Sequence, residues 1–344
     1  MRYFVVIFIV LAGLAPAAAA LPNTGEFSSI DGVGRFISNY RLKPSPTRVP
    51  AAVKALANLG AFKDADSAGV YVGFIAGVIG SNPVRAEDLI AKMLPLPPPD
   101  QWLLVRAIAY SGHPDWEGLL HKFSDRLPLR KVMIEKYLDG TLQTLDEVAL
   151  EKKSPTLWEK MRGTFRSSKN EKRVVEMTYD KSPELLDTLW GYYFATGSYG
   201  PIARIVNLLP WSNDRDSTDR LTIGSMAKYT LASNAARDTA LLAMLKAASK
   251  NQPKDTAKVL AEVIEAAETM ETTRLRKDAL ASIEELKRKG PGYKRDVSTW
   301  GKIGTGALAL GCIAAAATGQ VYMGLPCVIG GAASSAALNY WETQ

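Results

Sequence analysis

Residues 71–83 read YVGFIAGVIGSNP, and residues 190–201 read WGYYFATGSYGP. Both stretches are apolar and free of charge, and each ends in a turn of glycine and serine that closes with proline. Val70, Phe74 and Val78 recur at helical spacing, and glycine and proline are helix terminators. The two stretches therefore look like copies of one unit, a buried helix followed by a sharp turn.

The same 3.6-residue period continues along most of the chain, and no run of alternating apolar and polar residues indicates a strand. The turn at Gly112 follows Gly80 by about the length of a helix-pair repeat. We expect an all-α fold with an α-solenoid-like helical-repeat body over residues 50–289. The signature spacings of tetratricopeptide and ankyrin repeats are absent, so a non-repetitive helical domain remains the alternative.

The segment Leu189–Gly197 and the proline-initiated helix after it resemble a pattern in uncharacterised exported α-helical proteins of bacteria. The resemblance is clear over about 25 residues around Leu189–Pro201 and only loose over the rest of the chain. It implies a helical fold and carries no activity.

The N-terminus has the features of a secretory signal. Arg2 precedes an apolar run, Phe4–Leu14, that is too short to span a bilayer, and Ala18–Ala20 has the pattern of a cleavage site. We expect a signal peptide over 1–20 and an extended leader over 21–49; the alternative is an uncleaved N-terminal anchor. The protein is then exported across the cytoplasmic membrane and is periplasmic or membrane-associated.

The net charge of +7 is mildly basic and favours anionic surfaces. Basic and aromatic residues are not interleaved as in nucleic-acid binders, so we expect no nucleic-acid partner. Residues 151–173 hold eight Lys or Arg against three Glu. Such a basic amphipathic helix can lie on a membrane surface, although it can also be a solvated helix packed on its neighbour. The candidate membrane-surface residues are Trp158, Met161, Arg162 and Phe165.

Motifs that carry catalytic chemistry are nearly absent. The two histidines, His113 and His121, have no further ligands nearby for a metal site. Ser225 and Lys228 match the S-x-x-K pattern of penicillin-binding proteins, but the later elements of that motif are incomplete and its fold needs a sheet. We therefore expect no catalytic residue, cofactor or metal, and classify the chain as a non-enzyme.

Residues 303–341 contain 39 positions without a charge, and 19 of them are Gly, Ala or Ser. Small residues at four-residue steps allow close helix packing, which predicts a helical hairpin. The only two cysteines, Cys312 and Cys327, either form a disulfide or pack as small apolar residues. The small-residue face comprises Gly304, Ala307, Gly311, Ala315 and Gly319.

The surroundings of this hairpin argue against a single transmembrane span. The basic linker 290–302 precedes it on the exported side, contrary to the positive-inside preference. We expect a short hairpin that inserts from the exported side, with Trp300 and Trp341 at the interface, or one buried against protein.

These features predict an exported, non-enzymatic helical binding or scaffold protein, tethered to a membrane or to an unknown protein partner by 303–341. One alternative is a membrane-active protein that forms pores or perturbs a bilayer. The second alternative is an enzyme without a recognisable motif.

Overall fold

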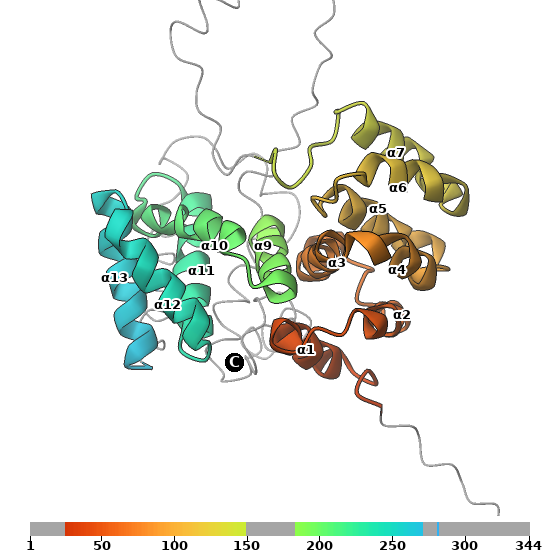
Figure 1. Cartoon of the computed structure of the whole chain (residues 1–344). Helices are drawn as coiled ribbons and strands as arrows, with labels where there is room; N and C mark the ends of the chain where they lie inside the picture. Colours follow the sequence, from red (N-terminus) through yellow and green to blue (C-terminus); the bar gives the residue numbers. More distant parts are fainter. Residues whose placement is uncertain (1–24, 149–182, 271–280, 282–344) are drawn as a thin grey trace, which may run out of the picture.

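The computed structural model describes residues 25–148, 183–270 and 281, and all regular structure in these ranges is helical (Figure 1). The all-α prediction is confirmed for this part of the chain. The α-helices are α1 Ile30–Asn39, α2 Val49–Asn58, α3 Gly69–Ser81, α4 Ala86–Met93, α5 Gln101–Ala109, α6 Trp116–Phe123, α7 Lys131–Leu138, α9 Pro183–Thr196, α10 Tyr199–Val206, α11 Thr218–Ala235, α12 Thr239–Ala248 and α13 Lys254–Glu268.

Short 3-10 turns join several of these helices. Four of them begin with proline and lead directly into an α-helix: η2 Pro46–Arg48, η4 Pro83–Arg85, η5 Pro98–Asp100 and η7 Pro128–Arg130. Proline has no N–H to lose at a helix start, and its fixed φ angle suits the first helical turn. The local sequence thus sets where α2, α4, α5 and α7 begin.

The extended leader expected over 21–49 is wrong for its second half, because α1 forms there. Ser29 caps α1 by accepting the N–H of Gly32 at 3.1 Å. Val33, Phe36 and Ile37 are buried against the rest of the fold. The glycine, serine and asparagine content gives α1 a weak intrinsic propensity, so packing of its apolar face forms the helix rather than composition.

Helix α3 is the centre of the molecule. Every residue from Gly69 to Ile79 is buried, so α3 has no solvent-facing side. Helix α9 lies along it in parallel: Gly69 meets Glu184, Gly73 meets Thr188, and Gly77 meets Ala195. The two stretches that look alike in the sequence are therefore packed on each other, as Figure 1 shows for α3 and α9.

Glycine makes this contact close. A Cβ atom at Gly73 would collide with the carbonyl oxygen of Thr188, and one at Gly191 would collide with that of Val70. At Gly77 the added atom would lie 2.6 Å from the Cβ of Ala195. Backbone meets backbone along this interface, as in helix pairs with small residues at four-residue steps.

The other helices add to this pair on both sides (Figure 1). Helix α5 packs on α3, α7 on α5, and α4 on α2, while α10 and α11 contact α9. Helices α12 and α13 complete the far side by packing on α11. Helix α9 packs on α3 although more than a hundred residues of sequence separate their contacting residues, such as Gly73 and Thr188.

An aromatic cluster joins α9 to α11. Trp190 is fully buried, stacks on Phe194 with ring centroids 5.8 Å apart, and donates its indole N–H to the hydroxyl of Thr230 at 3.1 Å. A buried indole N–H needs such an acceptor, so this contact fixes the side of α9 that faces α11.

Several predicted segments lie outside the described residues: the signal peptide 1–20, the basic stretch 151–173, the linker 290–302 and the hairpin 303–341. Within the described ranges, none of the helices combines the length and the apolar character that a membrane crossing requires.

Replacing Gly73 with Ala tests the backbone contact between α3 and α9. The new methyl group must displace the backbone of α9, so we expect Gly73→Ala to lower the free energy of unfolding by about 3 kcal/mol. Urea unfolding followed by circular dichroism measures this. Gly200→Ala is the control, because a Cβ there meets nothing within 4 Å. An equal stability loss in both variants would contradict the close-contact explanation.

Candidate functional site

Two buried ion pairs join distant parts of the chain at opposite ends of α9. Arg41, from η1 (Tyr40–Leu42), pairs with Asp238 before α12. Arg106 of α5 pairs with Glu184 in the first turn of α9. All four side chains are at most 12% exposed. Tyr193 lies beside the first pair, and Asp187 lies one turn after Glu184 of the second.

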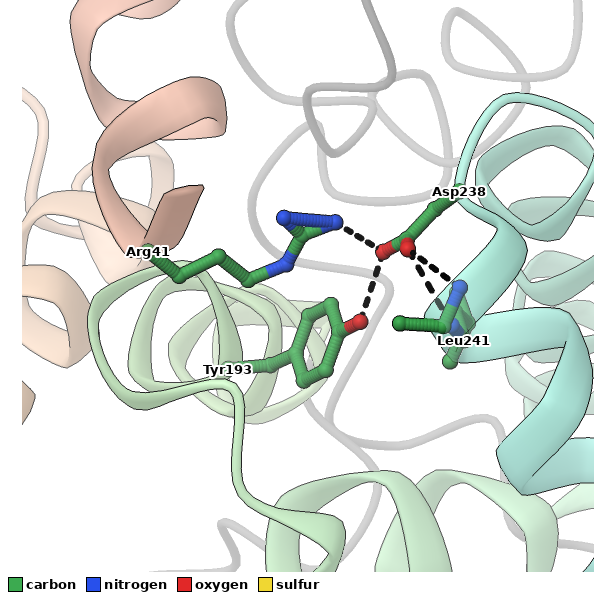
Figure 2. Close-up of polar contacts among 5 residues, drawn as sticks. Arg41, Tyr193, Asp238 and Leu241 are labelled. Carbon is green, nitrogen blue, oxygen red and sulfur yellow. Dashed lines mark hydrogen bonds and ion pairs between the residues drawn. The ribbon is translucent and has the colours of Figure 1, made fainter. Parts of the chain in front are cut away.

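Asp238 is shared by three elements, as Figure 2 shows. Its Oδ1 accepts the backbone N–H groups of Ala240 and Leu241, each at 3.1 Å, and so caps α12. Its Oδ2 accepts both the guanidinium of Arg41 and the hydroxyl of Tyr193, the latter at 2.6 Å. The Arg41 guanidinium also lies 5.2 Å from the centre of the Tyr193 ring. One carboxylate thus holds η1, α9 and α12 together.

The contacts of Arg41, Tyr193 and Asp238 hold helices in position. Burial and the hydrogen bond to Asp238 both raise the pKa of Tyr193, so the phenol stays protonated and remains a donor. Asp238 uses both oxygens in contacts within the protein. A buried pair of this kind specifies which groups meet, because separating them leaves a charge without a partner.

Asp187 lies one turn after Glu184 and has a different environment. Its side chain is buried at the α3–α9 contact next to Gly69, and neither carboxyl oxygen has a hydrogen-bond partner. Burial raises its pKa well above the usual range, and the negative charge of Glu184 raises it further. Burial therefore favours the neutral, protonated form of Asp187 over the carboxylate.

Two buried tyrosines surround the same region of α3. Burial raises the pKa of Tyr40 to about 12. Burial also raises the pKa of Tyr71, with smaller contributions from the charges of Asp187 and Asp31. Both phenols stay neutral at physiological pH, and their rings pack in edge-on contacts with Phe74 and Phe62 respectively. They act as core residues.

The residues singled out for chemistry in the sequence occupy structural positions. His113 sits in the turn after Gly112, where its Nδ1 accepts the N–H of Asp115 at 3.0 Å. Lys228 pairs with Glu262 of α13 at 2.5 Å, and the nearby Ser225 is buried in α11. In the S-x-x-K pattern, Lys228 therefore joins two helices through an ion pair, and Ser225 is packed in the interior.

The remaining candidate residues lie outside the described ranges. They are the possible disulfide, the small-residue face and the membrane-surface group: Cys312, Cys327, Gly304, Ala307, Gly311, Ala315, Gly319, Trp158, Met161, Arg162 and Phe165. In the part of the chain that the structure describes, no group of three or more His, Cys, Asp or Glu is arranged to hold a metal ion.

Comparison with known proteins adds no assignment, since no family model, curated protein or solved structure matches this chain. The resemblance of the stretch around Leu189–Pro201 to exported bacterial proteins stays a prediction.

The sequence carried a signal for only part of this buried polar region. Asp187 is an acidic residue inside an otherwise apolar helical segment, which is a visible irregularity. The Arg41–Asp238 pair had no such signal, because its members are 197 residues apart and each looks like an ordinary surface charge.

Removing the titratable proton at Asp187 should change how stability depends on pH. Because the folded pKa is raised, the protonated group stabilises the protein fully below the unfolded pKa of about 3.9, and this contribution is lost as pH rises toward the folded value. Asn does not titrate, so we expect the stability of Asp187→Asn relative to the parent protein to increase as the pH rises above about 4, by up to about 1.4 kcal/mol per pH unit. Urea unfolding at several pH values measures the difference.

The control for this test is Asp88→Asn, since Asp88 is exposed in an i,i+4 pair with Lys92. A difference between Asp187→Asn and the parent that stays constant with pH would contradict a buried neutral acid.

Removing the Asp238 carboxylate should lower the free energy of unfolding more than removing the Tyr193 hydroxyl, which is one of its hydrogen-bond donors. Asp238→Ala strands the buried Arg41 guanidinium and uncaps α12, so we expect a loss of about 3–5 kcal/mol in unfolding free energy. Tyr193→Phe removes one hydrogen bond and should cost about 1 kcal/mol. Thermal and urea unfolding measure both. Equal losses in the two variants would contradict the central role of Asp238.

Proposed function

We propose that this chain is an exported, non-enzymatic helical binding or scaffold protein, tethered to a membrane or a protein partner by residues 303–341. The observation that carries the proposal is the contrast between two parts of one chain. The described body is held by ordinary core packing and buried ion pairs, whereas 303–341 is free of charge and rich in small residues.

The body suits a binding role because its helices form an array. We interpret α2 to α7 as the solenoid-like part, in which α2 packs on α4, α3 on α5, and α5 on α7. Helix pairs stacked in this way create extended surfaces, which are the usual binding sites of such folds. Helices α9 to α13 then form an added group docked through α9 on α3.

The buried polar groups favour a scaffold role for the protein over a catalytic role. Arg41, Tyr193 and Asp238 engage one another, and Arg106 engages Glu184. These contacts hold the helices in position, and we infer that a partner binds to the surface of the described helices. The charge-free segment then fixes where that surface is presented.

Deleting 303–344 tests the tether. We expect the full chain to fractionate with membranes or in a large complex, and the truncated chain to move to the soluble fraction, because the deletion removes the apolar contact. Immunoblots of the fractions measure this, and equal thermal unfolding temperatures show that the body remains folded. Identical fractionation of both chains would contradict the tether.

A second variant keeps the length of the tail. Ala315→Lys places one charge within the segment, and we expect it to weaken the association, since a charge is costly in lipid or in an apolar interface. Crosslinking of the full chain then identifies a protein partner. Release of dye from anionic vesicles by the full chain but not by the truncated one would instead favour the membrane-active alternative.

A further inference from the structure

Asp187 lies where two groups of helices meet. One group is α1 to α7 and the other is α9 to α13, and α9 packs along α3 between them (Figure 1). Asp187 is 1% exposed, and a Cβ atom added to Gly69 of α3 would lie 3.1 Å from the Cβ of Asp187. A carboxyl group is therefore enclosed in the contact through which the second group is docked on the first.

The carboxyl oxygens of Asp187 lack hydrogen-bond partners among the residues that the structure describes. The carboxylates at the two ends of α9 differ in this respect. Glu184 accepts the guanidinium of Arg106, and Asp238 accepts the hydroxyl of Tyr193. A carboxylate with such donors is stabilised inside a protein, whereas one without donors loses its hydration and gains nothing in return. Ionisation of Asp187 therefore becomes favourable when water reaches it.

The titratable groups around Asp187 add negative charge. Glu184, one turn earlier on α9, raises the pKa of Asp187 through its charge. The Tyr71 phenol of α3 is close enough that the charges of Asp187 and of Asp31 in α1 raise its pKa. The guanidinium of Arg106 reaches this end of α9 from α5, but it is paired with Glu184. An ionised Asp187 would therefore face like charges without a donor of its own.

Charged groups on the other elements that contact α9 are exposed or engaged elsewhere. Asp64, before η3 (Ala65–Ser67), and Arg35 of α1 are exposed to solvent. The remaining cations have partners on other residues: Arg41 with Asp238, Arg204 with the carbonyl oxygens of Leu145 and Val148, Arg220 with Asp214, and Lys228 with Glu262. These partners keep the cations from compensating a charge on Asp187.

We propose that Asp187 makes the contact between α3 and α9 a pH-sensitive joint. The joint is closed while Asp187 carries a proton. When the proton leaves, the carboxylate stands beside Glu184 without a donor, and α9 moves away from α3 until water reaches it. Opening changes the surface that the two groups of helices present together. That consequence rests on the proposed binding role, whereas the joint itself does not.

The direction of the pH dependence follows from the two states of the joint. Burial raises the pKa of Asp187 well above its usual range in the closed state, while a solvated aspartate in the open state titrates near about 3.9. The closed state therefore binds the proton more tightly and is favoured at low pH. As the pH rises from about 4 toward the folded value, the ratio of open to closed molecules increases by up to about tenfold per pH unit.

Amide hydrogen exchange of the full chain, read by mass spectrometry from about pH 4 to about pH 8, tests the joint. Each rate is corrected for the intrinsic exchange rate at that pH. We expect the amides of α3 and α9 to lose protection as the pH rises, by up to about tenfold per pH unit. The amides of α12 and α13 should keep their protection, because these helices pack on α11 and on each other.

Two variants separate Asp187 from other titrating groups. Asp187→Asn has no proton to lose, so the protection of its α3 and α9 amides should stay constant across the same pH range. Asp88→Asn is the matched control, because Asp88 is exposed on α4, and it should follow the parent chain. If circular dichroism shows that Asp187→Asn does not fold, the comparison of α3 and α9 with α13 in the parent chain decides the matter.

Protection of α3 and α9 that does not change with pH in the parent chain would overturn the proposal. An equal loss of protection in all helices would also overturn it, since that result reports unfolding of the whole body instead of opening at one contact. Hydrogen exchange is measured within the body, whereas the tether is read from fractionation, so a failure of one is distinguishable from a failure of the other.

Discussion

The close parallel packing of α3 on α9 is the contact on which the rest of the structure depends. Gly73 and Gly191 let the two backbones meet without intervening side chains. Because α3 is buried on all sides, it also supports α5 on one flank, while α9 supports α10 and α11 on the other. A side chain added at this contact would separate the two groups of helices, since backbone atoms cannot yield as a flexible side chain can.

The buried ion pairs act on this core contact by fixing its ends. Glu184 meets Arg106 at the start of α9, and Tyr193 meets Asp238 near its end. Apolar packing is non-directional and tolerates small slips, whereas a buried charge must find its one partner. Asp187, between these ends, has no hydrogen-bond partner for either carboxyl oxygen, and burial raises its pKa. Apolar packing thus brings α3 and α9 together, and the contacts of Glu184 and Tyr193 fix how far α9 is shifted along its neighbours.

Much of the helical architecture was predictable from local pattern. The period of 3.6 and the proline and glycine turns located α3, α5, α9 and α10, because these helices are apolar and their ends carry strong terminators. Helix α1 was missed, since its glycine, serine and asparagine content is typical of an extended leader, and only its packing in the core stabilises it. Gly69, Gly73 and Gly77 follow one another at four-residue steps in the sequence, as do the small residues within 303–341. Only the fold shows that α9 packs on these three glycines.

The sequence by itself determined the helical class of fold, the turns that bound helices such as α3 and α9, and the absence of charge in 303–341. These are properties of neighbouring residues, so they can be read from spacing and composition. The tertiary structure alone decided that α9 returns to α3, that Arg41 meets Asp238, and that Asp187 is buried against Gly69. Those contacts join residues far apart in the chain, and their stability comes from complementary shape and from charges removed from water, which a linear pattern does not record.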